Sequence, residues 1–451
     1  MTTRLAAFAV LAGLSLGACA SDDDSGSVAS PSPTAASGDR GWLEGEPDWA
    51  GEPVGGDAEY ATAATTTAAT GKAAASAVGD DVPVPPLPQQ ADLRAGSVDD
   101  NAEFDEYLEY LTRIRSLGVG LRDFDPTGRI VVTVTGTSGL PVAGADIEVA
   151  SDGTTLAHIR TTADGTARFH PALYGAATAT AFQFSTGEAS ATAAPGQTVE
   201  LAAGAAGGAD APVAVDVLFL LDATGSMGDE IDRLKTSIDA VAAQVSQLQS
   251  QPDVRFAMTL YRDLTDQFVT STFDFTADVP EFRTALAQVV AAGGDDYPEA
   301  LEEGLAEALA KPSWRDPATT LQLVFLVADA PPQIGRQVAT EYPASISAAV
   351  ERGLKIFPVA SSESDDQAEA VFRQLAQATG SRFVFLTYGA GGAATGGSTD
   401  IDRTDYEELA LDQLIVRLIA EELAALTGTS ADDTTDDTTP DTTPDTNPDG
   451  Q

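Results

Sequence analysis

Short apolar runs alternate with helical patterns over the second half of the chain. The runs VAVDVLFLL, VRFAMTLYRD, QFVTSTFDF, LQLVFLVAD, LKIFPVA and RFVFL predict strands. Apolar residues spaced three or four apart predict helices between them, at 231–248, 281–290, 298–310, 344–352, 367–379 and 405–426. Near-continuous apolar strands are typical of parallel strands that are covered on both faces. Residues 213–427 are therefore predicted to form a doubly wound α/β sheet.

A different pattern occupies residues 128–203. Apolar residues such as Ile147 and Val149 alternate with polar neighbours, and the dipeptides Asp152-Gly153 and Asp164-Gly165 are typical of hairpin turns. Strands at this spacing predict a small all-β sandwich.

A helical pattern precedes this region, within residues 101–127. Five apolar or aromatic residues fall on one helical face, and Asp100 with Glu103 resembles a capping pair. We expect this helix to pack on a neighbouring domain; the alternative is a helix that binds a partner.

The two ends of the chain lack sustained periodicity. Residues 19–100 are rich in Ala, Thr, Ser, Gly, Pro and Asp, and they are predicted to be a disordered tether. Residues 428–451 form a low-complexity acidic segment without lysine or arginine, which predicts a disordered tail.

The first residues have the pattern of an export signal. Arg4 is followed by an apolar run of secretory length, which is too short for a comfortable membrane-spanning helix. The run ends in LGAC, which resembles a bacterial lipobox. That resemblance implies a lipoprotein signal peptide at residues 1–18, a lipid attached to Cys19, and an exported protein anchored in a bacterial cell envelope. A plain signal peptide with an incidental cysteine is the alternative.

Composition narrows the range of functions. The 451 residues carry a formal net charge of −45, which argues against nucleic-acid binding and against docking on an anionic membrane. Cys19 is the single cysteine, so an intrachain disulfide is excluded. With only His158 and His170 in addition, a zinc site of Cys and His is also excluded, and both histidines are expected to be structural or at the surface.

Oxygen-bearing side chains gather at three predicted strand ends. Asp222, Thr224 and Ser226 follow the first strand of the α/β segment, Asp296 lies in the loop GGDDYPEAL, and Asp329 ends the strand LQLVFLVAD. Ligands of open α/β sheets bind at the carboxyl ends of the strands. Carboxylates and hydroxyls without sulfur or imidazole suit a hard cation, so the sequence predicts a site for Mg²⁺, Mn²⁺ or Ca²⁺.

The motif DATGSM resembles the D-x-[ST]-x-S motif of the von Willebrand factor type A family. In that family the motif forms a metal-ion-dependent adhesion site. The loop GGDDYPE resembles a subgroup with G-G-x-D-x-P-E, so Asp296 takes the place of the usual threonine. An aspartate there is expected to tighten cation binding and to weaken the attraction for an incoming carboxylate. The preceding region, GLPVAGADIEV to TTADGTARF, resembles immunoglobulin-like or carboxypeptidase-regulatory-like domains of bacterial surface proteins.

The roles of neighbouring residues stay open at this stage. Asp263 and Asp295 are expected either to support the site or, more simply, to be solvated at the surface. Glu299 is a candidate cap for the helix expected to begin near Pro298.

These features predict a binding protein rather than an enzyme. The expected function is that of a cell-envelope lipoprotein which binds a divalent cation, Mg²⁺ foremost, and through it a protein or glycan. A structural spacer with a stabilising or vestigial metal site is the alternative. DATGS also resembles the D-K-T-G-T motif of cation-pumping ATPases, but Ala223 replaces the lysine and the later G-D-G-x-N-D segment is absent, so phosphoryl transfer through Asp222 is not expected.

Overall fold

The computed structural model describes residues 94–187, 189–208, 212–248, 250–294, 297–361, 364–387 and 409–427. The predicted signal peptide, Cys19, most of the predicted tether and the acidic tail lie outside these residues, and so do Asp295 and Asp296. Within the described ranges, no helix combines the length and the apolar character needed to cross a bilayer.

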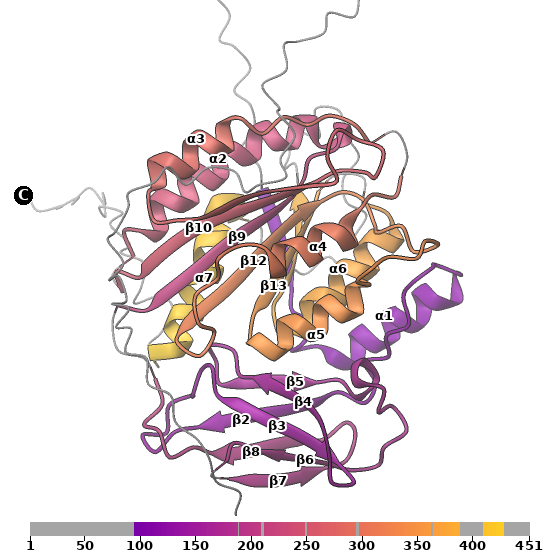
Figure 1. Ribbon diagram of the computed structural model, residues 1–451, viewed down its shortest axis with the longest axis vertical. Helices are drawn as coiled ribbons and strands as arrows, with labels where there is room; N and C mark the ends of the chain where they lie inside the picture. Colours follow the sequence, from indigo (N-terminus) through magenta and orange to yellow (C-terminus); the bar gives the residue numbers. More distant parts are fainter. Residues whose placement is uncertain are drawn as a thin grey trace, which may run out of the picture. The chain divides into compact units, whose positions relative to one another are not determined.

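A mixed sheet of eight strands forms the centre of the α/β segment, as predicted. Its strands, in spatial order, are β11 (Thr270–Thr276), β10 (Asp253–Tyr261), β9 (Ala214–Asp222), β12 (Thr320–Ala328), β13 (Lys355–Ala360), β14 (Phe383–Thr387), β1 (Arg94–Val98) and β15 (Leu409–Ala410). The five strands from β10 to β14 are parallel to their neighbours, whereas β11, β1 and β15 pair antiparallel. Figure 1 shows β10, β9, β12 and β13 side by side.

Helices cover both faces of this sheet (Figure 1). One face carries α2 (Gly228–Val245), α3 (Val279–Ala287) and α7 (Leu411–Thr427), and the other carries α4 (Leu301–Ala310), α5 (Tyr342–Arg352) and α6 (Asp366–Thr379). Successive residues of β9 point to opposite faces, so Phe219 joins the first cluster and Leu218 and Leu220 join the second. Burial on both faces explains why β9 and β12 read as continuous apolar runs.

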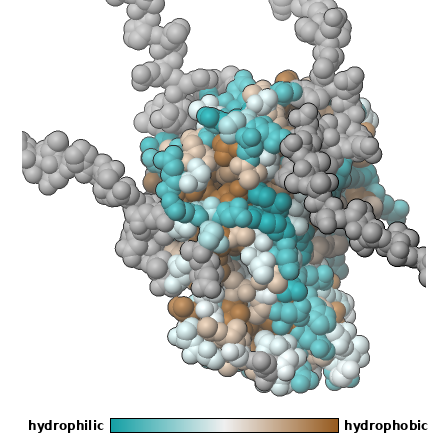
Figure 2. All heavy atoms as spheres, turned by 60° about the vertical axis from the view of Figure 1, so that its left-hand side comes forward, coloured by the Kyte–Doolittle hydropathy of each residue, from teal (hydrophilic) through white to brown (hydrophobic). Residues whose placement is uncertain are grey.

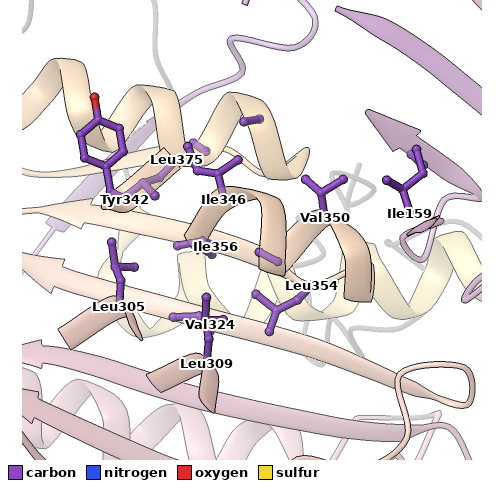
Figure 3. Close-up of a cluster of buried hydrophobic side chains, with 14 of the residues drawn as sticks. Ile159, Leu305, Leu309, Val324, Tyr342, Ile346, Val350, Leu354, Ile356 and Leu375 are labelled. Carbon is purple, nitrogen blue, oxygen red and sulfur yellow. The ribbon is translucent and has the colours of Figure 1, made fainter. Parts of the chain in front are cut away.

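Figure 3 shows part of the second cluster. Leu309 of α4, Val324 of β12, Ile346 of α5 and Leu375 of α6 are buried together. Full burial of each aliphatic side chain contributes about 1.5–3 kcal/mol relative to exposure. Figure 2 shows one face of the molecule, on which hydrophilic residues lie beside patches of apolar residues.

The end of the predicted tether is a strand of the main sheet. Residues 19–100 were expected to be disordered, but β1 runs antiparallel to β14, with Arg94 opposite Thr387 and Val98 opposite Phe383. The sequence RAGSV has no strand-like alternation, so the prediction for its last residues is wrong. The strand forms because an edge of the sheet supplies backbone partners for it.

The predicted N-terminal helix is shorter than expected. Helix α1 (Phe104–Ser116) buries Tyr107, Leu111 and Ile114 against α6. The predicted capping pair does not form, because Glu103 makes no side-chain capping bond. The Asp100 carboxylate instead accepts hydrogen bonds from Arg373 Nε at 2.9 Å and Arg373 Nη2 at 2.6 Å.

Residues 130–202 form two small sheets, here called the β-region. One sheet has the order β5 (Thr166–Phe169), β2 (Ile130–Thr135), β8 (Thr198–Ala202); the other has the order β4 (Thr154–Arg160), β3 (Asp146–Ser151), β6 (Phe182–Ser185), β7 (Ser190–Ala193). A 3-10 turn, η1 (Pro171–Tyr174), lies between β5 and β6. Alternate residues are buried, and Phe169 and Phe182 meet edge to face at 5.1 Å between ring centres. Ile159 of β4 joins the cluster beside α5 (Figure 3).

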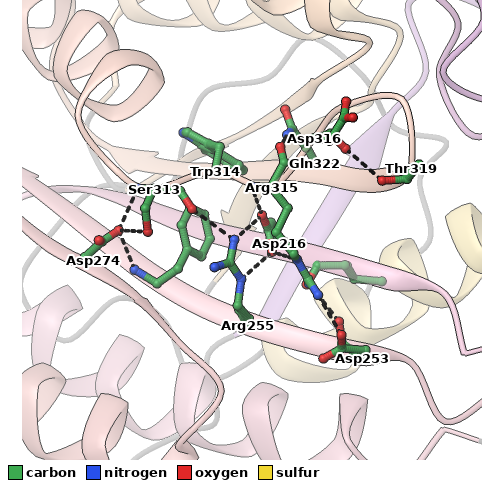
Figure 4. A network of polar contacts seen from close by, with 12 residues as sticks. Asp216, Asp253, Arg255, Asp274, Ser313, Trp314, Arg315, Asp316, Thr319 and Gln322 are labelled. Carbon is green, nitrogen blue, oxygen red and sulfur yellow. Dashed lines mark hydrogen bonds and ion pairs between the residues drawn. The ribbon is translucent and has the colours of Figure 1, made fainter. Parts of the chain in front are cut away.

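A buried aspartate fixes the N-terminal end of β9 (Figure 4). Asp216 is fully buried and accepts two hydrogen bonds from Arg255 side-chain nitrogens, at 2.7 and 3.0 Å. It also accepts from Arg315 Nε at 2.8 Å and from the Arg315 backbone N–H at 2.9 Å. The two guanidinium groups satisfy both oxygens of the carboxylate, which is the condition for burying a charge at low cost.

Candidate metal centre

The candidate site lies where two neighbouring parallel strands end. Asp222 is the last residue of β9, and Asp329 directly follows β12. β9 pairs with β10 on one side and with β12 on the other. The strands that follow β9 in the sequence are therefore added first on one side of it and then, from β12 onwards, on the other side. Such a switch point opens a crevice at the carboxyl ends of the strands. The sheet topology therefore brings these two predicted residues together.

Hydrogen bonds join the three predicted residues of the first loop. Asp222 Oδ1 accepts from the backbone N–H of Thr224 at 3.0 Å and from its hydroxyl at 2.7 Å. The hydroxyl oxygens of Thr224 and Ser226 lie 3.2 Å apart. A short 3-10 turn, η2 (Gly225–Met227), leads from these residues into α2. The spacing of two residues thus places one carboxylate and two hydroxyls in one group.

This group runs from the interior to the surface. Asp222 and Thr224 are fully buried, whereas Ser226 is exposed at the mouth of the loop. Asp222 Oδ2 has no hydrogen-bond partner among the described atoms. Burial, and then the negative charge of Asp329, raise the pKa of Asp222, whereas the Thr224 hydrogen bonds and the Tyr261 hydroxyl beside the carboxylate lower it. The surroundings of Asp222 thus disfavour its ionised form, which a positive charge at this place would stabilise.

The second predicted loop is described on both sides of Asp296, which itself lies outside the described residues. The backbone N–H of Gly225 donates to Gly293 O at 2.9 Å, and that of Ala292 donates to Ala223 O at 3.0 Å. Gly294 has a φ of +70°, and a Cβ on it would lie 2.8 Å from Thr224 Cβ. The second loop therefore packs directly against the first, beside the Thr224 side chain.

Glu299 lies beside the candidate site and does not have the capping role that the sequence led us to expect. Helix α4 begins at Leu301, and no side chain caps it, so Glu299 is not its cap. Glu299 is only 3% exposed, and its Oε2 has no hydrogen-bond partner among the described atoms. Burial raises the pKa of Glu299 to about 8, with further contributions from Asp222, Asp263 and Asp329. The motif GGDDYPE contains this glutamate, so a signal for it was present.

Asp263 and Asp266 hold the surrounding loops. Asp263, for which surface solvation was the simpler expectation, is only 3% exposed, and its Oδ1 accepts from Gln333 Nε2 at 2.6 Å. Asp266 Oδ2 accepts from the backbone N–H groups of Asp263 and Gly294 at 2.9 and 3.0 Å. The expectation of a solvated Asp263 is therefore wrong. Its carboxylate ties the loop after β10 to the loop after β12.

Over the described residues, no group of three or more His, Cys, Asp or Glu side chains is arranged to hold a metal ion. The candidate donor set differs from such a group, because it combines Asp222 and Asp329 with the hydroxyls of Thr224 and Ser226. A hard cation fits this chemistry, since one Asp222 oxygen is buried without a partner.

The two histidines lie in the β-region, away from this set. His158 is exposed beside Asp146, and His170 is buried against Phe124.

Comparisons with solved structures give weak matches. Proximal thread matrix protein 1 from the mussel byssus is 15% identical, with a TM-score of 0.28 over 37% of this chain and 40% of that one. The pilus adhesin SpaC from Lactobacillus rhamnosus GG, in an open conformation, is 10% identical, with a TM-score of 0.29 over 44% of this chain and 29% of that one. Scores this low do not establish a shared fold.

Sequence comparison gives a relative and a family. Alpha-protein kinase vwkA from Dictyostelium discoideum is 32% identical over 122 residues, which make up 27% of this chain. The chain spans only 19% of the length of that relative. Residues 216–388 match the family model described as von Willebrand factor A domain, and this range contains the first loop, Glu299 and Asp329. Residues 216–388 are therefore a von Willebrand factor A domain.

Proposed function

We propose that this domain binds a divalent cation through Asp222, Thr224 and Ser226, with Asp296 and Asp329 completing the site. Domains of this family are generally involved in adhesion and protein interactions. A bound cation offers an open coordination position to an oxygen atom of a protein or glycan partner. Mg²⁺ is the preferred candidate, with Mn²⁺ or Ca²⁺ as alternatives. The role is binding rather than catalysis.

One observation carries the proposal. Asp222 is fully buried, and its Oδ2 has no partner among the described atoms. A buried carboxylate in this condition is costly, because burial removes the water that would solvate its charge. The hydroxyls of Thr224 and Ser226 add lone pairs beside it without adding charge. A cation at this place satisfies the free oxygen and offsets the repulsion from Asp329.

The N-terminal sequence supports a location of the protein in a bacterial cell envelope. Residues 1–18 are proposed to be a lipoprotein signal peptide, with Cys19 lipidated and the chain held in a bacterial cell envelope. The β-region is proposed to be an immunoglobulin-like or carboxypeptidase-regulatory-like domain. Replacement of Cys19 by serine should move the protein from the membrane fraction to the soluble fraction, and unchanged fractionation would contradict the anchor.

Thermal unfolding of the whole chain in chelator and in added Mg²⁺, Mn²⁺ or Ca²⁺ tests cation binding. A cation that binds only the native state stabilises it by about 2.7 kcal/mol at a hundred times its dissociation constant. The shift should disappear in Asp222→Ala and persist in Asp232→Ala, whose side chain is 77% exposed on α2. The absence of a shift with all three cations would contradict the proposal.

A further inference from the structure

Two buried acidic side chains at the candidate metal centre each have an oxygen without a partner. Asp222 is one of them, and it belongs to the predicted donor set. Glu299 is the other: it is 3% exposed, and its Oε2 finds no hydrogen-bond donor among the described atoms. Such orphaned oxygens in native proteins call for a ligand, an ion or water.

The backbone of Glu299 is fixed between the second and third loops of the site. Its N–H donates to Pro331 O at 3.0 Å, and it forms a parallel bridge with Pro332, shortly after Asp329. Its side chain reaches back to the first two loops. A Cβ on Gly294 would lie 2.6 Å from Glu299 Oε1 and 2.8 Å from Thr224 Cβ. The glutamate carboxyl group therefore lies beside the Thr224 side chain.

The surroundings of Glu299 are acidic. In addition to burial, the negative charges of Asp222, Asp263 and Asp329 each raise the pKa of Glu299. None of the described side chains forms an ion pair with Glu299. The guanidinium group of Arg262 donates to the backbone oxygens of Ala223 and Val290. The described part of the protein therefore supplies no positive charge directly beside the Glu299 carboxyl group.

The rim of the site is apolar at several points. The described residues include four large exposed hydrophobic side chains, and three of them lie on loops around this edge of the sheet: Leu264, Val290 and Tyr297, at 40%, 57% and 49% exposure. Two hydrogen bonds connect these loops to the site. Arg262 donates to the backbone oxygen of Val290, and the backbone N–H of Gly294 donates to the Asp266 carboxylate.

The inference rests on the cation site proposed above. We propose that Glu299 is the internal acid of that site, and that it meets the bound cation through water. With Asp222 and Asp329 beside the cation and Glu299 behind a water molecule, the negative charge at the site already exceeds the +2 of the cation, so a further carboxylate is repelled. The partner group is neutral, an amide, carbonyl or hydroxyl oxygen, and apolar residues flank it.

Calorimetric titration of the full chain with Mn²⁺ tests this role. Outer residues that orient a metal's ligands typically change metal affinity about 10–100-fold when they are substituted. Glu299→Gln and Glu299→Ala should therefore weaken Mn²⁺ binding by about this factor. Glu307→Gln is the matched control, because Glu307 lies on the same helix and pairs with Lys311 instead. Added acetate should restore Mn²⁺ affinity in Glu299→Ala and should not tighten binding by the unsubstituted chain.

Circular dichroism establishes that each variant is folded, and Glu299→Gln decides alone if the alanine variant does not fold. If the Glu299 variants bind Mn²⁺ with unchanged affinity, this inference is overturned and the proposed function still stands. Loss of affinity without rescue by acetate in a folded Glu299→Ala would also overturn it, since that result indicates a structural role. If the unsubstituted chain binds no cation, the proposed function fails, and this inference fails with it.

Discussion

Lys355 on β13 and Glu422 on α7 form a buried ion pair, with 2.6 Å between Nζ and Oε1. Asp164 of the β-region lies 3.7 Å from the same Nζ. Burial raises the pKa of Glu422, and Lys355 opposes this rise. For Asp164 burial acts in the same upward direction, but Lys355 and Arg168 outweigh it and hold the pKa below its ordinary value. One lysine therefore connects the main sheet, the last helix and the β-region.

Removal of one member of this pair should destabilise the protein. Glu422→Gln leaves Lys355 buried with only the more distant Asp164, and loss of one partner of a buried pair costs about 3–5 kcal/mol. Glu421→Gln, the adjacent position on α7, breaks surface pairs with Arg417 and Arg382 and should cost less than about 1 kcal/mol. Urea unfolding at pH 7 measures both. Equal effects of the two substitutions would show that the Lys355 pair is energetically no different from a surface pair.

Asp216 should be as sensitive as Glu422. In Asp216→Asn the carboxylate that accepts from Arg255 and Arg315 becomes neutral, and both guanidinium groups lose their shared partner. We expect a loss of about 3–5 kcal/mol in the free energy of unfolding. Asp232→Asn, which removes an exposed pair with Lys235, is the control, with an expected change below about 1 kcal/mol. A loss in Asp216→Asn no larger than in the control would contradict this account of the network.

The sequence predicted those strands whose burial is complete. β9 and β12 are apolar along nearly their whole length because both faces of the sheet are covered, and this pattern is visible without a structure. β1 could not be predicted in the same way. Its residues RAGSV are paired through their backbone with β14, almost three hundred positions later. The partner of Asp100, Arg373, is similarly remote, so a local capping motif was the natural but wrong interpretation.

Part of the site was also predictable. Asp222, Thr224 and Ser226 are two positions apart, and their local hydrogen bonds follow from that spacing. Asp329 was placed correctly beside them because parallel strands end at one edge of the sheet. The burial of Glu299 and Asp263 depends on contacts with the loop after β12, through Pro331 and Gln333, and a single sequence does not show which loops pack together.

His170 should make stability depend on pH. It is fully buried, both ring nitrogens lack hydrogen-bond partners among the described atoms, and burial, with Arg129 and Arg168, lowers its pKa to about 3. The unfolded chain then binds a proton near pH 6.5 that the folded chain does not bind. The contribution of His170 to stability is therefore complete above pH 6.5 and falls as pH decreases towards 3.

Replacement by leucine should remove this contribution. Between pH 7 and pH 5, urea unfolding of the unsubstituted chain should lose about 2 kcal/mol more than unfolding of His170→Leu. His158→Gln is the control, because His158 is exposed and hydrogen-bonded to Asp146. An identical pH dependence for His170→Leu and the unsubstituted chain would contradict the assignment to His170.

Gly294 should be required for the shape of the site. In Gly294→Ala the new methyl group meets Glu299 Oε1 and Thr224 Cβ at less than 3 Å, and φ is +70°. Strain of this kind costs about 1–3 kcal/mol. Gly335→Ala, in the loop after β12, is the control, since nothing lies within 4 Å of its Cβ. Thermal unfolding and Mn²⁺ titration should both show the difference. Normal stability and normal Mn²⁺ affinity in Gly294→Ala would mean that the two loops do not approach as described.

We propose above that a divalent cation binds at the end of β9. The most direct measurement is the anomalous diffraction of crystals grown with Mn²⁺, for the unsubstituted chain and for Asp222→Ala. We expect a single strong peak beside the hydroxyls of Thr224 and Ser226, and we expect it to be absent in the variant. A peak elsewhere, or no peak at this place at saturating Mn²⁺, would contradict it.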